Sequence, residues 1–206
     1  MTEKPVHPPV ARRERRAWYL YDFGNSAYAS VVLLAVYAAY FKETVVGGAR
    51  GSFLWGLSVG LATLVVAILS PILGAFADAA GSKKRFLFAF TTMSCVFTAA
   101  LFFVTKGSIV TGMLFFILAE LGYRSAQGFY DALLPEIATE AEMGRVSGNG
   151  WAIGSAGGIL VLILVIALTQ LVKAPWVTQA SLVLTAVFFA AFASPIFVWL
   201  LARGTP

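Results

Sequence analysis

Six long apolar stretches dominate the sequence and constrain its fold more than any other feature. The hydrocarbon core of a membrane is about 30 Å thick, and a helix that rises about 1.5 Å per residue needs around 20 residues to cross it. Each of the six stretches meets this length. The predicted spans lie near 17–41, 53–77, 86–105, 109–134, 149–171 and 177–201.

The composition and the pattern of these stretches predict helices in a bilayer. Hydrophobic residues make up 59% of the chain and charged residues 12%, whereas soluble domains carry roughly 25% charged residues. Membrane-spanning strands alternate in polarity over roughly ten residues, and the run 158–167 does not alternate. The first stretch is too long for a signal-peptide core and contains Asp22 and Asn25. We therefore expect an all-α integral membrane protein with lipid as its surroundings.

Basic residues predict the orientation, because Lys and Arg accumulate in cytoplasmic segments. With both termini in the cytoplasm, the inner segments hold ten basic residues and the outer loops hold four. Residues 1–16 then form a basic cytoplasmic tail and residues 17–206 the transmembrane domain. The net charge of +5 is mostly this topology signal, so no nucleic-acid partner is expected.

The sequence contains no residue pattern typical of a metal site, a cofactor site or an enzyme active site. Cys95 is the single cysteine, and no metal-ligand spacing is present. No apolar stretch contains a histidine that could activate a serine nucleophile. We expect no metal, no cofactor and no enzymatic activity.

The loop after the second stretch carries the most specific motif of the chain. Gly74 is followed by Asp78 four residues later and by Gly81 three residues further, and then comes the basic triplet Lys83, Lys84 and Arg85. Glycines let backbones turn and approach closely. A carboxylate at this boundary can accept hydrogen bonds from a helix N-terminus or pair with a basic residue. The alternative is an ordinary basic loop.

This spacing resembles the signature between the second and third helices of the Major Facilitator Superfamily, G-x-x-x-D-x-x-G-x-[RK]-[RK]. Ser82 stands where many members have arginine. In the fourth stretch, the pattern from Arg124 through Gln127 to Gly128 is similar to the R-x-x-Q-G pattern of many members. Residues 18–28, 130–137 and 145–154 resemble the branch named for the autophagy-related vacuolar amino-acid effluxer, which also has bacterial members.

The resemblance implies a fold and a class of function. Transporters of this superfamily are built from two six-helix halves around a midplane site, each half a 3+3 inverted repeat. The resemblance covers nearly the whole chain but only the N-terminal half of such a transporter. It implies transport of small organic solutes, with amino acids as the class that the branch name offers, in a bacterial cytoplasmic (inner) membrane.

Polar residues cluster in the first and fourth stretches, where such a fold places its cavity-lining helices. Ionisable groups in a membrane cost roughly 2.5–3.5 kcal/mol each on insertion scales, so they usually face a cavity and mark function. Glu120 and Arg124 are four residues apart and can pair on one helical face. The substrate-binding or coupling candidates are Asp22, Asn25, Tyr28, Glu120, Arg124, Gln127 and Asp131.

Two interpretations of this polar stripe stay open. In the first, Arg124 binds an anionic group of the solute, while Glu120 or Asp22 exchanges a proton. In the second, Glu120 and Arg124 form a permanent ion pair between helices, and Asp22 pairs with basic groups at the inner face. Tyr28 either lines the cavity or packs in the core. Four glycines that recur along the fifth stretch are predicted to allow close helix packing: Gly150, Gly154, Gly157 and Gly158.

The functional prediction is a half-size, proton-coupled secondary transporter of small organic solutes. Six helices form only one wall of a cavity, so we expect a homodimer, a separate six-helix partner, or a second half that this sequence does not include. The alternative is a channel or a non-transporting membrane receptor. The loop residues Gly74, Asp78, Gly81, Lys83, Lys84 and Arg85 are predicted to form its gate.

Overall fold

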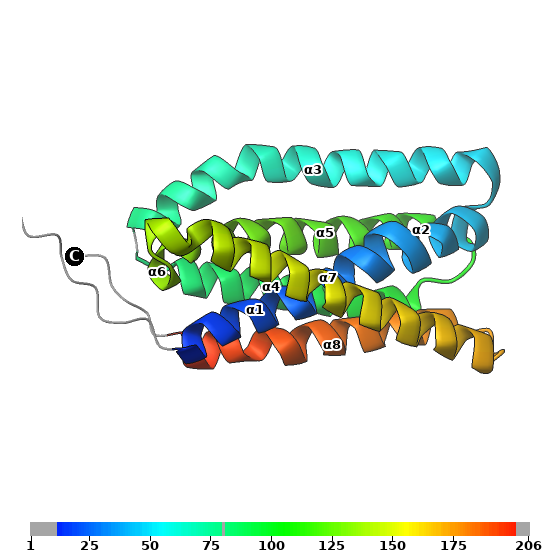
Figure 1. The fold of residues 1–206 in the computed structure, drawn as a ribbon. Helices are drawn as coiled ribbons and strands as arrows, with labels where there is room; N and C mark the ends of the chain where they lie inside the picture. The colour runs from blue at the N-terminus through cyan, green and yellow to red at the C-terminus, as the bar shows by residue number, and fades with distance from the viewer. Residues whose placement is uncertain (1–11, 80, 201–206) are drawn as a thin grey trace, which may run out of the picture.

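The computed structural model describes residues 12–79 and 81–200, and this part of the chain consists of helices joined by short loops, without strands (Figure 1). The helices run along a common direction and form a bundle. The main helices are α1 (Arg12–Ala27), α3 (Gly48–Ala79), α4 (Lys83–Ala100), α5 (Ile109–Asp131), α7 (Glu140–Leu171) and α8 (Val177–Trp199). The short elements are η1 (Tyr28–Ala35), α2 (Val36–Tyr40), η2 (Phe41–Val46), η3 (Leu101–Phe103) and α6 (Leu134–Ile137).

Six helical units in the described residues are long and apolar enough to cross a membrane, which confirms the predicted all-α membrane fold. The first unit runs continuously from Arg12 to Val46. Residues 12–16, which sequence analysis assigned to the tail, are therefore helical, while residues 1–11 lie outside the described part. The fifth unit begins at Glu140 rather than near 149, because the Thr139 and Glu142 side chains form a capping box at its start.

The first unit is not a regular α-helix. Two π-helical segments, η1 and η2, interrupt it on either side of the short α2. A π-helical segment widens the turn and changes the direction of the side chains that follow, and such segments often occur at functional sites. Tyr28, one of the predicted site residues, is the first residue of η1.

Aromatic side chains fix α1 inside the bundle. Tyr21 is fully buried, and its ring stacks on Tyr130 of α5 with centroids 4.9 Å apart. Trp18 also stacks on the Tyr130 ring, with centroids 4.4 Å apart, and its indole nitrogen donates a hydrogen bond to the Tyr130 carbonyl oxygen. Phe189 of α8 meets Tyr21 edge to face. This cluster holds α1 against α5 and α8, which sets the position of the polar residues one turn further along α1.

The predicted glycine packing on α7 is confirmed. A Cβ atom at Gly150 would overlap the Trp18 ring, and one at Gly157 would overlap the backbone of Phe23. A Cβ at Gly154 would collide with the carboxylate of Asp22. Because these glycines lack side chains, α7 can approach the polar face of α1 closely.

Basic residues gather at one end of the bundle, where α1 begins, the α3–α4 turn and the α5–α7 connection lie, and α8 ends (Figure 1). We call this the basic end. Its described basic residues are Arg12, Arg13, Arg15, Arg16, Lys83, Lys84, Arg85 and Arg145. The opposite end carries four, Lys42, Arg50, Lys106 and Lys173. The asymmetry agrees with the charge count used to predict the orientation.

Candidate functional site

The centre of α5 carries a buried ion pair. Glu120 is fully buried, and its Oε1 accepts a hydrogen bond from Arg124 Nε at 2.6 Å. The Arg124 side chain is 35% exposed, so it extends from the buried carboxylate to a part of the bundle that is accessible to solvent or ligand. Both residues belong to α5, and the pair therefore joins one turn of this helix to the next. It cannot by itself hold two helices together, as the structural interpretation of this pair requires.

The fully buried Tyr28 lies beside this pair, and its hydroxyl group is a side-chain hydrogen-bond partner of the Glu120 carboxylate. The alignment is poor, and neither Glu120 Oε2 nor the Tyr28 hydroxyl makes a well-formed hydrogen bond with a described residue. The Tyr28 ring stacks on Tyr123 with centroids 4.6 Å apart. Buried polar groups in folded proteins are nearly always paired, so each exception calls for an explanation such as a bound water, proton or ligand. Among the described residues, Oε2 has only the poorly aligned Tyr28 hydroxyl as a partner.

A hydrogen-bonded row continues the polar stripe and connects α1 with α5. Asn25 Nδ2 donates to Gln127 Oε1 at 2.5 Å, and Gln127 Nε2 donates to Asp131 Oδ1 at 3.3 Å. Asn25 is 2% exposed, and its Oδ1 is another acceptor without a partner in the described chain. The row therefore brings three of the predicted residues into contact across two helices.

Asp22 lies where α1 faces α7. Its carboxylate fills the space above Gly154, and it interacts with Asn25 and with Asp131. The structure thus places Asp22 next to the hydrogen-bonded row. Six of the seven residues predicted as binding or coupling candidates lie where α1 and η1 face α5, and Asp22 lies beside them on the side that faces α7.

The glycine and aspartate loop forms a tight turn between α3 and α4. Gly81 has a φ of 56°, in the left-handed region that favours glycine, and Ser82 N donates to Ala77 O at 3.0 Å. Asp78 forms an ion pair with Lys83 at 3.2 Å and remains largely exposed. Of the two predicted partners for Asp78, the structure contains the basic residue. A Cβ at Gly74 would meet nothing within 4 Å, so no described residue explains this glycine by close packing.

Lys84 and Arg85 differ in their contacts. Lys84 donates from Nζ to the carbonyl oxygen of Leu200 at 2.5 Å, which ties α4 to the end of α8. Arg85 is exposed and forms no ion pair with a described residue. A small cavity of about 140 Å³ lies between α3 and α5 beside Asp78 and Lys83.

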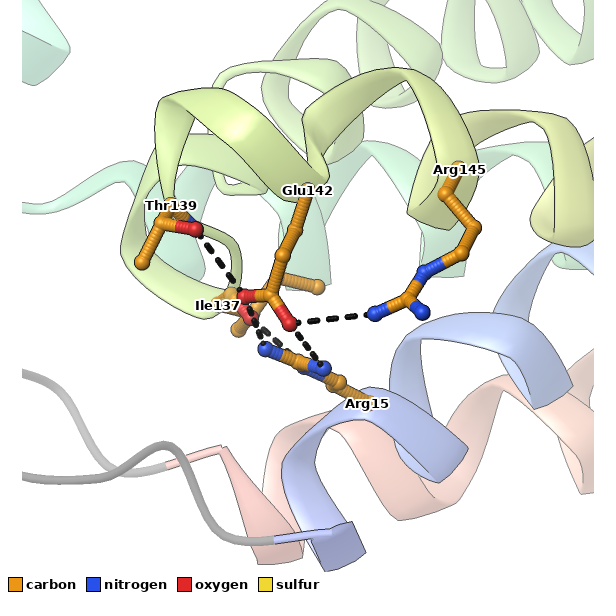
Figure 2. Close-up of polar contacts among 5 residues, drawn as sticks. All are labelled: Arg15, Ile137, Thr139, Glu142 and Arg145. Carbon is orange, nitrogen blue, oxygen red and sulfur yellow. Dashed lines mark hydrogen bonds and ion pairs between the residues drawn. The ribbon is translucent and has the colours of Figure 1, made fainter.

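A second charged cluster, which sequence analysis missed, lies at the basic end (Figure 2). Arg15 of α1 donates from Nη1 and Nη2 to the two carboxylate oxygens of Glu142, at 3.1 and 2.6 Å, and from Nε to Ile137 O at 3.0 Å. Arg145 and Thr139 also donate to Glu142. The capping pattern of Thr139 and Glu142 was visible in the sequence. Nothing local in the sequence connects them with Arg15.

The comparisons with known proteins agree with the motif evidence. Residues 50–206 match the family model described as vacuole effluxer Atg22 like. The chain belongs to this family of the Major Facilitator Superfamily. The resemblance drawn from the α3–α4 loop and from α5 is therefore confirmed at the level of the family.

Two curated relatives of this Atg22-like chain are bacterial. It is 32% identical over 194 residues to the uncharacterized MFS-type transporter YxiO of Bacillus subtilis (strain 168), covering 89% of this chain and 45% of that protein. It is 25% identical over 156 residues to an uncharacterized protein of Aquifex aeolicus (strain VF5), covering 75% of this chain and 39% of that protein. The chain thus spans less than half the length of either relative. No solved structure matches it.

Proposed function

We propose that the chain forms one six-helix unit of a secondary active transporter for small organic solutes. One observation carries the proposal: a buried carboxylate, Glu120, whose ion pair lies within its own helix, is next to a hydrogen-bonded polar row between two membrane-spanning helices. Polar groups in a membrane interior are costly and usually mark a pathway. Membership in the facilitator superfamily and the relative described as an MFS-type transporter support the same function.

Arg124 binds an anionic group of the solute in this proposal. Its Nε is engaged by Glu120, whereas no described residue bonds to its Nη1 or Nη2. These two nitrogens form a planar fork that fits a carboxylate with two parallel hydrogen bonds. Amino acids, the solute class that the resemblance to the amino-acid effluxer branch implies, carry such a carboxylate.

Glu120 exchanges a proton during the cycle, and Asp22 is the second candidate for this role. A carboxyl group in a low-dielectric cavity binds a proton more readily than in water. Glu120→Gln keeps the shape of the side chain and cannot titrate. We expect this variant to lose the pH dependence of solute uptake, measured across a range of external pH in proteoliposomes. Glu43→Gln, at the opposite end of the bundle, is the control. Unchanged pH dependence in Glu120→Gln would remove Glu120 as the proton carrier and leave Asp22.

A second six-helix unit completes the cavity in this proposal. Among the described residues the polar stripe occupies α1, the start of η1 and α5, and the facilitator architecture closes such a cavity with another half. The unit is a second copy of this chain, a separate protein, or a further part of a longer chain. The mass of the solubilised particle distinguishes two copies from one. In the assembled transporter, the α3–α4 loop from Gly74 to Arg85 serves as a gate at the cytoplasmic side of a bacterial inner membrane.

The transport activity itself is tested by flux. Purified protein is reconstituted into liposomes, and uptake of a labelled amino-acid mixture is measured with and without an imposed proton gradient. We expect accumulation above equilibrium only with the gradient. Passive conductance without accumulation would support a channel, and specific binding without flux would support a receptor. Arg124→Gln, which removes the proposed binding group, is expected to lose uptake. Arg50→Gln, an exposed change at the opposite end of the bundle, is its matched control.

A further inference from the structure

A groove of about 700 Å³ lies at the basic end between the start of α1 and the end of α8. Three arginines, one leucine and one tryptophan line it: Arg12, Arg13, Arg16, Leu20 and Trp199. The groove is separate from the polar stripe of α1 and α5. Neither the transport proposal nor the family assignment makes use of it.

The charge of the groove is positive and unneutralised within the described chain. All three arginines are exposed, and none of them forms an ion pair with a described acidic residue. Glu14 lies between them in sequence, but it is 2% exposed and does not line the groove. Arg15, on the same helical turn, is different because it is engaged by Glu142. At the start of α1, Arg15 is therefore paired with Glu142, whereas the other three arginines line the groove.

The other wall of the groove is apolar and typical of a membrane interface. Leu20 lies one turn beyond Arg16 along α1, further from the basic end. The Trp199 ring lies under the Arg13 guanidinium, with 4.9 Å from Cζ to the ring centroid, within the range of a cation–π contact. Tryptophan is enriched at the level of lipid headgroups. A ligand here meets guanidinium groups at the helix start and apolar surface one turn deeper.

We propose that this groove binds the headgroup of an anionic phospholipid. The arginine forks fit a phosphate with paired hydrogen bonds. The apolar wall of Leu20 and Trp199 fits the glycerol and upper acyl region that follows the phosphate in a lipid but is missing from a free anion. Basic clusters next to a membrane span attract anionic lipids in the same way. The site depends on the insertion of α1 and α8 in a bilayer and not on the solute or direction of transport.

The experiment compares lipids with the same acyl chains on the purified full chain. Native mass spectrometry follows the binding of phosphatidylglycerol, phosphatidylcholine and inorganic phosphate. We expect phosphatidylglycerol to bind more tightly than phosphatidylcholine. Each arginine contributes roughly fivefold to affinity, so the triple change R12Q/R13Q/R16Q is expected to weaken phosphatidylglycerol binding on the order of a hundredfold. Arg16→Gln alone, with roughly fivefold weaker binding, carries the test if the triple variant does not fold.

A matched control separates a defined site from general charge attraction. The variant K42Q/R50Q/K106Q removes the same number of charges at the opposite end and is expected to retain binding. Equal losses in both triple variants would overturn the proposal. Equal affinity for the two lipids would also overturn it. Displacement of the lipid by millimolar inorganic phosphate would show that the groove binds a soluble anion instead. Trp199→Leu is expected to weaken lipid binding and to leave any phosphate binding unchanged.

Discussion

Two charged clusters of this chain differ in how fully their carboxylates are hydrogen-bonded. At the basic end, both oxygens of Glu142 are satisfied by Arg15, Arg145 and Thr139 (Figure 2). In the middle of α5, Glu120 is more deeply buried but has one well-formed hydrogen bond, from Arg124, and its second oxygen has only the poorly aligned Tyr28 hydroxyl as a partner. The more buried carboxylate is therefore the less satisfied one.

We propose that this difference separates a structural contact from a functional one. Donors to Glu142 come from Arg15 of α1 and from Thr139 and Arg145 at the start of α7, so through Arg15 this cluster joins segments far apart in sequence. The donor to Glu120 comes from its own helix, so the pair adds no contact between helices. A buried ion pair is weak evidence for stability. We propose that the central cluster serves binding rather than fold stability.

The largest expected effect is that of Arg124→Gln, which leaves the Glu120 carboxylate buried without its charged donor. Breaking a buried ion pair on one side costs about 3 kcal/mol or more. We expect a lower unfolding temperature in detergent together with loss of solute flux in proteoliposomes. Arg50→Gln, exposed and at the opposite end, is expected to change neither quantity.

The double variant E120Q/R124Q distinguishes the two roles of this pair. Two amides remove both charges and can hydrogen-bond to each other, so the unfolding temperature is expected to return toward that of the unaltered chain. Flux is expected to remain lost, because the binding fork and the titrating carboxyl are both gone. Recovery of flux along with stability would show that the central pair is structural after all.

A smaller effect is expected where α7 brings Asp22 and its neighbours into place. Gly157→Ala would push a methyl group into the backbone of Phe23, which cannot move aside as a side chain can. Overpacking of this kind typically costs 1–3 kcal/mol. Gly148→Ala on the same helix meets nothing within 4 Å and is the matched control. Thermal unfolding of the two variants measures the difference. Equal stability would mean that α1 and α7 are not packed as described.

Features set by neighbouring residues could be predicted from the sequence. The six spans follow from the length of apolar runs, and the Glu120–Arg124 pair follows from a spacing of four on one helix. The packing role of the α7 glycines follows from small residues that recur on one face. The family followed from two short motifs. Each of these signals lies within one helix or one loop.

Features that depend on how helices meet could not be predicted in the same way. Arg15 and Glu142 are 127 positions apart, and their contact depends on the rotation of α1 about its own axis. The π-helical segment from Tyr28 to Ala35 changes that rotation midway along the span, and no glycine or proline within it marks the change. The hydrogen bond from Asn25 to Gln127 likewise requires the mutual rotation of α1 and α5, which apolar patterning alone leaves open.

The smallest expected effect tests the cluster at the basic end. Arg15→Gln removes a two-pronged contact with Glu142 and the bond to Ile137 O, and we expect a loss of roughly 1–2 kcal/mol in unfolding free energy. Arg145→Gln removes a single contact from a side chain that is 70% exposed, so less than about 0.5 kcal/mol is expected. Arg15→Lys keeps the charge and loses the fork, and should fall between the two. Because this cluster holds segments together and binds no solute, flux per folded molecule should stay unchanged in all three variants. A selective loss of flux in Arg15→Gln would show that the basic end also takes part in transport. The Glu142 cluster could then no longer be distinguished by function from the Glu120–Arg124 pair.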